Sequence, residues 1–387
     1  MSAGATSEMA VSLDVSAVPS SPAGAGVYIL RLAEALARRS DLSLRLITRK
    51  NDAERFRSLA PEAMVRAAAP GARPARLAWE QTRLPRVLRG LDVEVHHSPH
   101  YTMPEASHLA RVVTVHDLTF FDHPEWHEPT KAVFFRRAIR VAARHADTIV
   151  CVSETTAARL RALCPPKGRL EVVRHGVDQT RFRPTEEEGG ADRRALAEIG
   201  VEPPYVAFVG TIEPRKDLPT LIRAFDRMCG AHPSLRLVVA GGRGWGLRPV
   251  DQALERARFR DRIVQTGYLD EERKPALLRQ AAAVAYPSLE EGFGMPVLEA
   301  LACGSPLVTT TGSAMEELAE GAAVLVAPGD VDGLAGALDM VVRADAGLPA
   351  RRVRGLAVAA RHTWAEAATA YAEVYRQARE AATSQVA

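Results

Sequence analysis

Strand-sized apolar runs alternate with amphipathic segments along the first half of the chain. The runs are rich in Val, Leu and Ile and are too short for helices, which predicts buried strands. Strands that alternate with helices of about 10–15 residues favour a parallel sheet with helices on both faces. We expect strands at Met9–Val15, Leu42–Thr48, Val93–His96, Ala110–Val115 and Thr148–Val152, and helices at Gly26–Arg39 and Lys131–His145.

The second half repeats this pattern after an interruption. A charge run, a Gly pair and a Pro pair occupy Thr185–Pro204, and we place a linker there. The final segment, Thr363–Ala381, has the pattern of one helix. The strands expected between them are Tyr205–Val209, Arg236–Ala240, Ile263–Thr266, Ala283–Tyr286, Pro306–Thr309 and Ala323–Leu325. Two doubly wound α/β domains in tandem are predicted, and ligands of such sheets bind at the carboxyl ends of the strands.

Composition narrows the class of protein. The chain has 387 residues, of which 47% are hydrophobic and 25% charged, so a folded core is expected. No apolar window reaches the roughly 18 residues of a membrane span. The segment MSAGATSEMA has no basic flank and no apolar stretch, so we expect no secretory signal and a cytoplasmic protein. The four cysteines form no CxxC pair, which disfavours a disulfide framework or a zinc site.

The net charge of +3 is unevenly distributed. Residues 1–185 hold 27 Lys and Arg against 19 Asp and Glu, whereas residues 186–387 hold 23 against 28. This excess is too weak to predict nucleic-acid binding, but it suits an acidic small molecule or an anionic membrane surface. The expected helix Lys131–His145 has Arg136, Arg140 and Arg144 on one face. That helix fits either contact with an anionic membrane or an ordinary surface position.

Two segments of the first half could carry chemistry. In SSPAGAGVY, Gly24 and Gly26 lie between the first strand and helix, where backbone N–H groups can approach an anion. The GxGxxG fingerprint would need a third glycine where Ile29 stands, so a nicotinamide enzyme is disfavoured and a tight turn is the alternative. His116 and Asp117 end an apolar strand, where His116 could bond a substrate and Asp117 could orient it or shape the turn.

The second half offers cations and carboxylates. Arg215 and Lys216 follow a strand. The planar guanidinium of an arginine and the compact ammonium of a lysine suit the two phosphates of a diphosphate. Glu291 and Glu299 stand on either side of a glycine-rich turn and an expected helix start at Met295. Such a turn exposes backbone N–H groups at the positive end of a helix, while the two carboxylates can accept hydrogen bonds from sugar hydroxyls.

These segments together resemble retaining glycosyltransferases of family 4. Glu291 and Glu299 in EEGFGMPVLEALACGSPLV match the EX7E motif of that family. The other matching segments, in the expected order, are GAGVY, VHDLTFF, VSE, HGVD, GTIEPRKDLPTLIRAF, VVAGGRGWG and GYLDEE. The resemblance implies the GT-B architecture: two Rossmann-like domains facing a cleft, with a C-terminal helix that crosses back to the first domain. The implied domains are an acceptor-binding unit, 1–184 plus 364–387, and a nucleotide-sugar-binding unit, 185–363.

The resemblance also assigns residue roles. It places Glu291 on hydroxyls of the transferred sugar, Glu299 on the nucleotide ribose, and Arg215 and Lys216 on the diphosphate. It places His116 near the sugar, so the implied catalytic residues are His116, Glu291, Arg215 and Lys216, with His116 and Asp117 on the acceptor side. The other implied donor-binding residues are Gly24, Gly26, Gly210, Tyr268, Leu269, Gly292, Phe293, Gly294 and Met295.

One departure from the family pattern affects these roles. Many members carry Arg directly after the strand glycine, whereas Thr211 follows Gly210 in this chain. Arg215 can supply that charge instead. Asp330 and Asp332 superficially match a DxD metal motif, but they open an expected helix and are better explained as helix caps. No cofactor or metal is therefore expected.

The expected reaction is the retaining transfer of a hexose by front-face substitution. The segments GTIEPRK and VHD resemble those of bacterial mannosyltransferases of surface glycan assembly, and this resemblance implies GDP-mannose as donor. The expected partners are this donor or a UDP-sugar and a glycan, lipid-linked or small-molecule acceptor, with peripheral contact to an anionic membrane at the inner face. The alternatives are a UDP-sugar-dependent transferase, an epimerase or glycogen synthase of the same fold, and a non-catalytic sugar-nucleotide-binding subunit.

Overall fold

The computed structural model describes residues 8–185, 190–344 and 347–386. The chain divides into two compact units. The first comprises the chain up to Gly176 together with the segment from Trp364 onward, and the second comprises Val177–Thr363. The first seven residues, on which part of the signal-sequence expectation rests, lie outside the described residues.

The first unit is built on a parallel sheet, which has seven strands within the described residues. Their order is β3-β2-β1-β4-β5-β6-β7, with β1 central between β2 and β4. Val11 of β1 is in register with Leu44 of β2 and Val95 of β4, and all three side chains are buried. The strands are β1 (Met9–Asp14), β2 (Leu42–Arg49), β3 (Met64–Ala69), β4 (Val95–Ser98), β5 (Ala110–Val115), β6 (Thr148–Cys151) and β7 (Arg169–Val172).

The second unit repeats the doubly wound plan with a parallel sheet of six strands within the described residues. In the order β10-β9-β8-β11-β12-β13, the chain adds strands on one side of β8 up to β10 and then on its other side from β11 onward. This change of side creates a topological switch point between β8 and β11. The strands are β8 (Tyr205–Val209), β9 (Arg236–Ala240), β10 (Ile263–Gly267), β11 (Ala283–Tyr286), β12 (Leu307–Thr310) and β13 (Val324–Val326).

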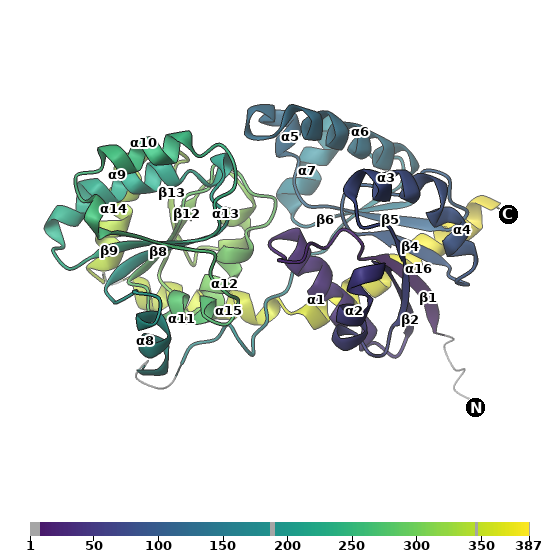
Figure 1. Ribbon diagram of the computed structural model, residues 1–387, viewed down its shortest axis with the longest axis horizontal. Helices are drawn as coiled ribbons and strands as arrows, with labels where there is room; N and C mark the ends of the chain where they lie inside the picture. Colours follow the sequence, from purple (N-terminus) through teal and green to yellow (C-terminus); the bar gives the residue numbers. More distant parts are fainter. Residues whose placement is uncertain (1–7, 186–189, 345–346, 387) are drawn as a thin grey trace. The chain divides into compact units, whose positions relative to one another are not determined.

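Helices cover both faces of each sheet (Figure 1). Those of the first unit are α1 (Ala25–Ala37), α2 (Ala53–Leu59), α3 (Arg73–Thr82), α4 (Leu84–Arg89), α5 (Thr119–Asp122), α6 (Pro129–His145), α7 (Glu154–Leu163) and α16 (Trp364–Val386). Those of the second are α8 (Gly190–Ala197), α9 (Leu218–Met228), α10 (Arg248–Arg256), α11 (Lys274–Arg279), α12 (Met295–Cys303), α13 (Ala314–Ala319), α14 (Val331–Val342) and α15 (Leu348–Arg361).

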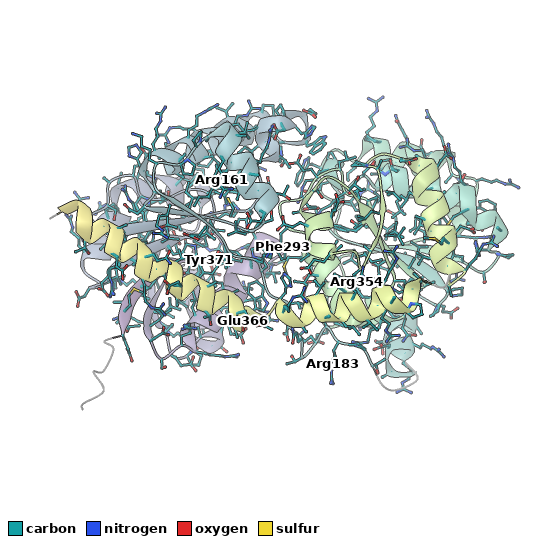
Figure 2. The ribbon with its side chains drawn as sticks, turned by 180° about the vertical axis from the view of Figure 1, so that it is seen from behind. Arg161, Arg183, Phe293, Arg354, Glu366 and Tyr371 are labelled. Atoms are coloured by element: carbon teal, nitrogen blue, oxygen red, sulfur yellow. The ribbon has the colours of Figure 1, made fainter. Side chains whose placement is uncertain are left out.

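The C-terminal helix α16 packs against α1 in the first unit, as the family resemblance implied. Tyr371 projects from α16 (Figure 2), and its hydroxyl lies 2.6 Å from that of Tyr28 on α1. Both rings are fully buried. Thr114 of β5 lies within 3.1 Å of each hydroxyl, so the helix is joined to the sheet by a buried polar contact as well as by apolar packing.

The structure corrects several expected element boundaries. Strands β3 and β7 were not expected, because both lie at the edges of their sheet and carry polar or exposed residues. Strand β4 begins at Val95, two residues later than expected, and helix α16 continues beyond Ala381. The four cysteines are all buried and free. Within the described residues, no helix combines the length and apolar character needed to cross a membrane.

The expected linker at Thr185–Pro204 is wrong for its described part. Helix α8 lies inside it, and buried Leu196 and an ion pair between Asp192 and Arg279 fix this helix to the second unit. Residues 186–189 of that segment lie outside the described residues. The division between the units falls at Gly176, eight residues before the expected boundary at 184.

Candidate functional site

The loops after β8 and β11 carry the candidate residues of the second unit. These strands are neighbours at the topological switch point, so the loops at their carboxyl ends lie next to each other. The first loop contains the short 3-10 helix Pro214–Lys216, and the second leads into α12. The backbone N–H of Leu289 donates to the carbonyl oxygen of Arg215 at 2.7 Å, which fastens one loop to the other.

Glu291 is the centre of a buried polar cluster. Its Oε1 accepts hydrogen bonds from the Lys216 ammonium and, at 3.1 Å each, from the hydroxyls of Tyr286 and Ser288. Its Oε2 accepts a hydrogen bond from the Arg215 guanidinium. The sequence-predicted residues Arg215, Lys216 and Glu291 therefore meet at one point.

The cluster holds Glu291 as an anion. Burial opposes its charge, but Arg215 and Lys216 outweigh burial and lower the pKa of the carboxyl to about 2. Burial and the neighbouring Arg215 cation lower the pKa of the Lys216 ammonium. Glu213, which sequence analysis did not single out, pairs with Arg215 at 2.7 Å. The carboxylates of Glu213 and Glu291 and the cations of Arg215 and Lys216 thus form one buried network of ion pairs.

Glycines allow the loops around this cluster to approach each other. A Cβ on Gly241 would lie 1.8 Å from the carbonyl oxygen of Gly210, so a side chain there would push apart the loops after β8 and β9. Gly294 has φ of +98°, which favours glycine, and it turns the chain into α12 at Met295. Pro296 has no N–H, and the N–H groups of Val297 and Leu298 donate to the carbonyl oxygen of Gly294. The N–H groups of Gly294 and Met295 therefore remain at this helix start for an anion. The neighbouring Phe293 is buried.

Glu299 has a different partner from Glu291. It lies on α12, and its Oε1 accepts a hydrogen bond from Lys274 of α11 at 3.0 Å. Its Oε2 is buried and has no hydrogen-bond partner among the residues that the structure describes. Burial raises the pKa of this carboxyl, partly offset by Lys274. A buried oxygen without a partner costs free energy, which a hydroxyl donor from a ligand would recover.

Tyr268 and Leu269 follow β10 in the second unit. Tyr268 is 62% exposed, and Leu269 is buried beside it. An exposed aromatic ring next to a buried aliphatic side chain offers a face on which a planar base can stack. The structure thus leaves Tyr268 accessible, and its contact with a base remains a prediction.

The glycine loop of the first unit leads into α1. Gly24 has φ of +50° and directly precedes the helix. A Cβ on Gly26 would lie 3.1 Å from Cβ of Pro22 and 3.2 Å from Cδ of Pro19. Both glycines therefore have a conformational or packing reason to be present, as the tight-turn alternative requires, and a role in donor binding remains a prediction.

His116 follows β5 and is held as a neutral ring. Its Nε2 lies 2.8 Å from the carbonyl oxygen of Pro99, which can only accept, so Nε2 donates and Nδ1 is left as an acceptor. Burial lowers the pKa of the ring. Asp117 does not orient His116: it accepts hydrogen bonds from the Tyr101 hydroxyl at 3.1 Å and the Thr119 hydroxyl at 2.9 Å. Asp117 thus shapes the turn, the second of its two expected roles.

Two further expectations concern metals and helix α6. Asp330 accepts a hydrogen bond from the backbone N–H of Gly333 at 2.9 Å, which confirms the expected helix cap. On α6, Arg136 donates to the carbonyl oxygen of Phe120, and Arg140 lies over the Phe121 ring. At least these two cations therefore contact the protein itself, and membrane contact through α6 stays a prediction.

Sequence analysis missed the residues that complete the donor-side clusters: Glu213, Tyr286, Ser288, Glu271 and Lys274. Tyr286 and Ser288 stand just before the quoted segment EEGFGMPVLEALACGSPLV, so their nearness in sequence to Glu291 was a usable signal. Lys274 stands 25 residues before its partner Glu299, and only the packing of α11 against α12 brings them together.

Comparison with known families matches most of the chain. The model of "Glycosyl transferases group 1" matches residues 192–354, and that of "Glycosyltransferase Family 4" matches residues 22–181. The O-antigen chain mannosyltransferase B of Escherichia coli is 28% identical over 78% of this chain and 77% of its own length. The glycogen synthase of Mycobacterium tuberculosis is 30% identical over 82% of this chain and 74% of its own length. The chain spans about half the length of D-inositol 3-phosphate glycosyltransferases that it also matches.

Solved structures share the fold at low sequence identity. The sucrose-phosphate synthase of Thermosynechococcus elongatus has a TM-score of 0.77 and 20% identity, covering 96% of this chain and 99% of its own. HepE of Anabaena, solved with UDP and glucose, has a TM-score of 0.73 and 19% identity, and the match covers 95% of this chain and 99% of HepE.

Proposed function

We propose that this chain, which belongs to glycosyltransferase family 4 and has the GT-B fold of a hexosyltransferase, transfers mannose from GDP-mannose to a hydroxyl acceptor with retention of configuration. The observation that carries this proposal is the buried cluster of Arg215, Lys216 and Glu291 at the switch point of the second unit. It combines two cations suited to a diphosphate with a carboxylate whose ionised form those cations favour, which suits sugar hydroxyls.

In the proposed reaction, the acceptor hydroxyl attacks the anomeric carbon from the face that the diphosphate leaves. The acceptor oxygen forms the new glycosidic bond as the bond from carbon to phosphate oxygen breaks. The departing β-phosphate takes the acceptor proton, so no protein nucleophile is needed. Negative charge grows on the leaving oxygen, and Lys216, Arg215 and the backbone N–H groups of Gly294 and Met295 stabilise it.

Glu291 and Glu299 bind the donor at two different places in this proposal. Glu291 accepts hydrogen bonds from hydroxyls of the transferred mannose. Glu299 accepts a hydrogen bond from a ribose hydroxyl at its partnerless Oε2. The base rests against Tyr268 and Leu269, and His116 accepts a hydrogen bond from the sugar or the acceptor through Nδ1.

The choice of mannose is supported by the similarity to the O-antigen chain mannosyltransferase B over most of both chains. A UDP-sugar donor is the second candidate, since HepE, which shares the fold, was solved with UDP and glucose. The proposed acceptor class is a glycan, a lipid-linked sugar or a small molecule. We propose a cytoplasmic enzyme with peripheral contact to the membrane, and one that requires neither metal nor cofactor.

Thermal unfolding with GDP, UDP, ADP and dTDP, each without divalent metal, tests the donor class. A ligand that binds only the native state at 100 times its Kd adds about 2.7 kcal/mol to the free energy of unfolding. We expect GDP to raise Tm more than the other three. A larger shift with UDP would favour the second candidate, and no shift with any nucleotide would contradict a nucleotide-sugar site.

A further inference from the structure

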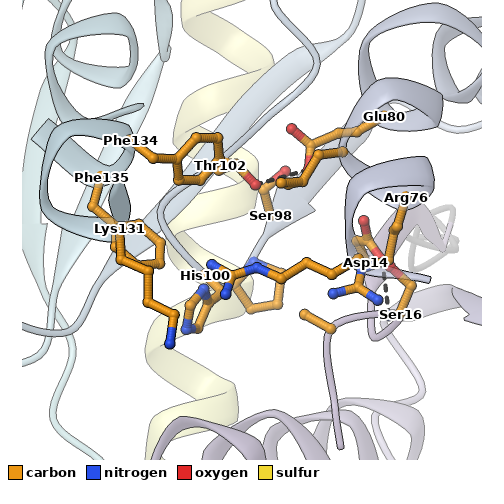
Figure 3. A pocket seen from close by; sticks show the side chains of 14 residues that line it. Asp14, Ser16, Arg76, Glu80, Ser98, His100, Thr102, Lys131, Phe134 and Phe135 are labelled. Atoms are coloured by element: carbon orange, nitrogen blue, oxygen red, sulfur yellow. Dashed lines mark hydrogen bonds between the residues drawn. The ribbon is translucent and has the colours of Figure 1, made fainter. Parts of the chain in front are cut away.

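The first unit contains a cavity of about 320 Å³ to which sequence analysis gave no role. It lies at the carboxyl ends of β1 and β4, with α3 and α6 on its sides (Figure 3). The carboxyl edge of a doubly wound sheet is where its ligands bind. The residues that line it and matter below are Asp14, Arg73, Arg76, Glu80, His100 and Lys131.

The cavity adjoins His116. Pro99 and His100 line it, and the Pro99 carbonyl oxygen accepts the hydrogen bond from His116. The rings of His100 and His116 have centroids 5.8 Å apart. A molecule in the cavity would thus lie next to the histidine that the family resemblance places near the sugar.

Three cations line the cavity, and they differ in their contacts. Arg73 lies over the Phe135 ring at 5.7 Å, and Lys131 pairs with Glu128 at 2.8 Å. Arg76, half-buried in the cavity wall, makes no side-chain hydrogen bond or ion pair with any described residue. Burial lowers the pKa of its guanidinium, the nearby carboxylate of Asp14 opposes this effect, and the cation of Arg73 adds to it. A guanidinium with five unused N–H donors favours an anion of planar or tetrahedral shape.

The carboxylates of the cavity already accept hydrogen bonds. Asp14 accepts one from the backbone N–H of Ser16 at 2.8 Å. Glu80 accepts one from the Thr102 hydroxyl at 2.7 Å and another from the Gln81 amide at 2.9 Å. Both carboxylates attract the Arg76 guanidinium electrostatically but form no ion pair with it. Their remaining lone pairs can accept hydrogen bonds from ligand hydroxyls while the N–H groups of Arg76 bind an anion.

We propose that this cavity is the acceptor subsite and that the acceptor is a sugar carrying an anionic group, either a phosphate or a carboxylate. Arg76, with Arg73 and Lys131 nearby, binds the anionic group. Asp14 and Glu80 accept hydrogen bonds from the sugar hydroxyls, and the rings of Phe134 and Phe135 cover the apolar face of the sugar ring. This assignment rests on the proposed transferase function, which it extends to a class of acceptor.

Calorimetric titration tests the subsite without relying on turnover. The probes are mannose, mannose 6-phosphate and mannuronate, titrated into wild-type protein, Arg76→Met, Arg76→Lys and the control Arg83→Met. Arg83 is exposed just after α3 and does not line the cavity. We expect at least one anionic sugar to bind more tightly than mannose, by tenfold or more. Arg76→Met should remove that preference, Arg76→Lys should keep part of it, and Arg83→Met should leave it intact.

Which anionic sugar binds identifies the source of the charge. Preference for mannose 6-phosphate assigns a phosphate, and preference for mannuronate assigns a carboxylate. Equal binding of all three sugars, no binding of either anionic sugar, or a preference that survives Arg76→Met would overturn the proposal. Hydrolysis of GDP-mannose without acceptor is measured in the same variants. If hydrolysis is absent while the anionic sugar still binds through Arg76, the proposed function fails and the anion subsite stands.

Discussion

The ammonium of Lys216 and the carboxylate of Glu291 form a buried ion pair. Sequence analysis gave these residues separate tasks, the diphosphate for Lys216 and the sugar hydroxyls for Glu291. Their contact couples the two tasks, because removing either side chain leaves the other as a buried charge with less compensation. Breaking such a pair commonly costs about 3–5 kcal/mol of stability. Variants that keep the shape of the side chain are therefore the informative ones.

Glu291→Gln keeps the shape and removes the charge. We expect transfer to fall by about 10–100-fold, which corresponds to one lost charge-assisted hydrogen bond of roughly 1.5–3 kcal/mol. Affinity for GDP should persist or increase, since Lys216 then has a weaker competitor for the diphosphate. Turnover and calorimetry measure the two effects, with exposed Glu255→Gln as control. Unchanged turnover would remove Glu291 from the sugar site.

Lys216→Met tests the phosphate contact. We expect GDP to bind at least tenfold more weakly, because a charged donor to the diphosphate is lost. Exposed Lys167→Met, in the first unit, should leave the Kd as in the wild type. Calorimetric titration of GDP without metal gives both values. Equal Kd values for Lys216→Met and the wild type would show that the diphosphate binds elsewhere.

Glu299→Gln tests the ribose contact through its partnerless Oε2. A hydrogen bond to a charged group is worth about 1.5–3 kcal/mol, so GDP affinity should fall by about 10–100-fold. The loss should shrink or vanish when 2′,3′-dideoxy-GDP is titrated, because that ligand has no hydroxyl to donate. If the variant loses the same affinity for both nucleotides, Glu299 does not read the ribose.

The sequence predicted the sheets well where strands are continuous apolar runs. Strands β8, β9 and β11 lie where they were expected, because both faces of a central parallel strand are buried and its sequence carries no polar alternation. Edge strand β3 was missed because Met64 and Arg66 are exposed, so the segment lacks the continuous apolar run of a buried strand and resembles a loop. Helix α8 was hidden by the charged residues around it, and its buried Leu196 and its ion pair with Arg279 place it against the second unit.

The residues of the candidate site likewise fall into those that the sequence predicted and those that it did not. Residues that stand together in a motif, such as Glu291 and Gly294, could be found from their spacing. Lys274 and the cavity residues Arg76 and Glu80 could not, because their partners are distant in sequence and lie on other elements. Local pattern determines which residues end a strand, whereas the packing of helices determines which of them meet.

Glu80 should make stability depend on pH. Burial raises the pKa of this carboxyl to about 7, from an ordinary value of 4.5. Between these pH values the folded chain binds more protons than the unfolded chain, so the free energy of unfolding should fall as pH rises through this window. Glu80→Gln should flatten this slope and stabilise the protein at pH 8 by roughly 1–3 kcal/mol. Denaturant titrations at several pH values check this, with exposed Glu62→Gln as control; an unchanged slope in Glu80→Gln would refute it.

Tyr371→Phe tests the attachment of α16. The variant removes a buried hydroxyl that contacts both Tyr28 and Thr114, and we expect the free energy of unfolding to fall by about 1–2 kcal/mol. Tyr268→Phe is the matched control, because Tyr268 is 62% exposed. Thermal or urea unfolding of both variants gives the comparison. Equal stability of the two would mean that the Tyr371 hydroxyl contributes nothing to the attachment of the helix.

The central claim is that the cluster around Glu291 activates a nucleotide-diphosphate sugar. Release of nucleoside diphosphate from GDP-mannose and UDP-glucose, without acceptor or metal, tests it most directly. We predict slow release of GDP from GDP-mannose by the wild-type protein, well above the rate without protein, and its loss in Glu291→Gln. No release from either donor, or release that Glu291→Gln leaves unchanged, would contradict the account.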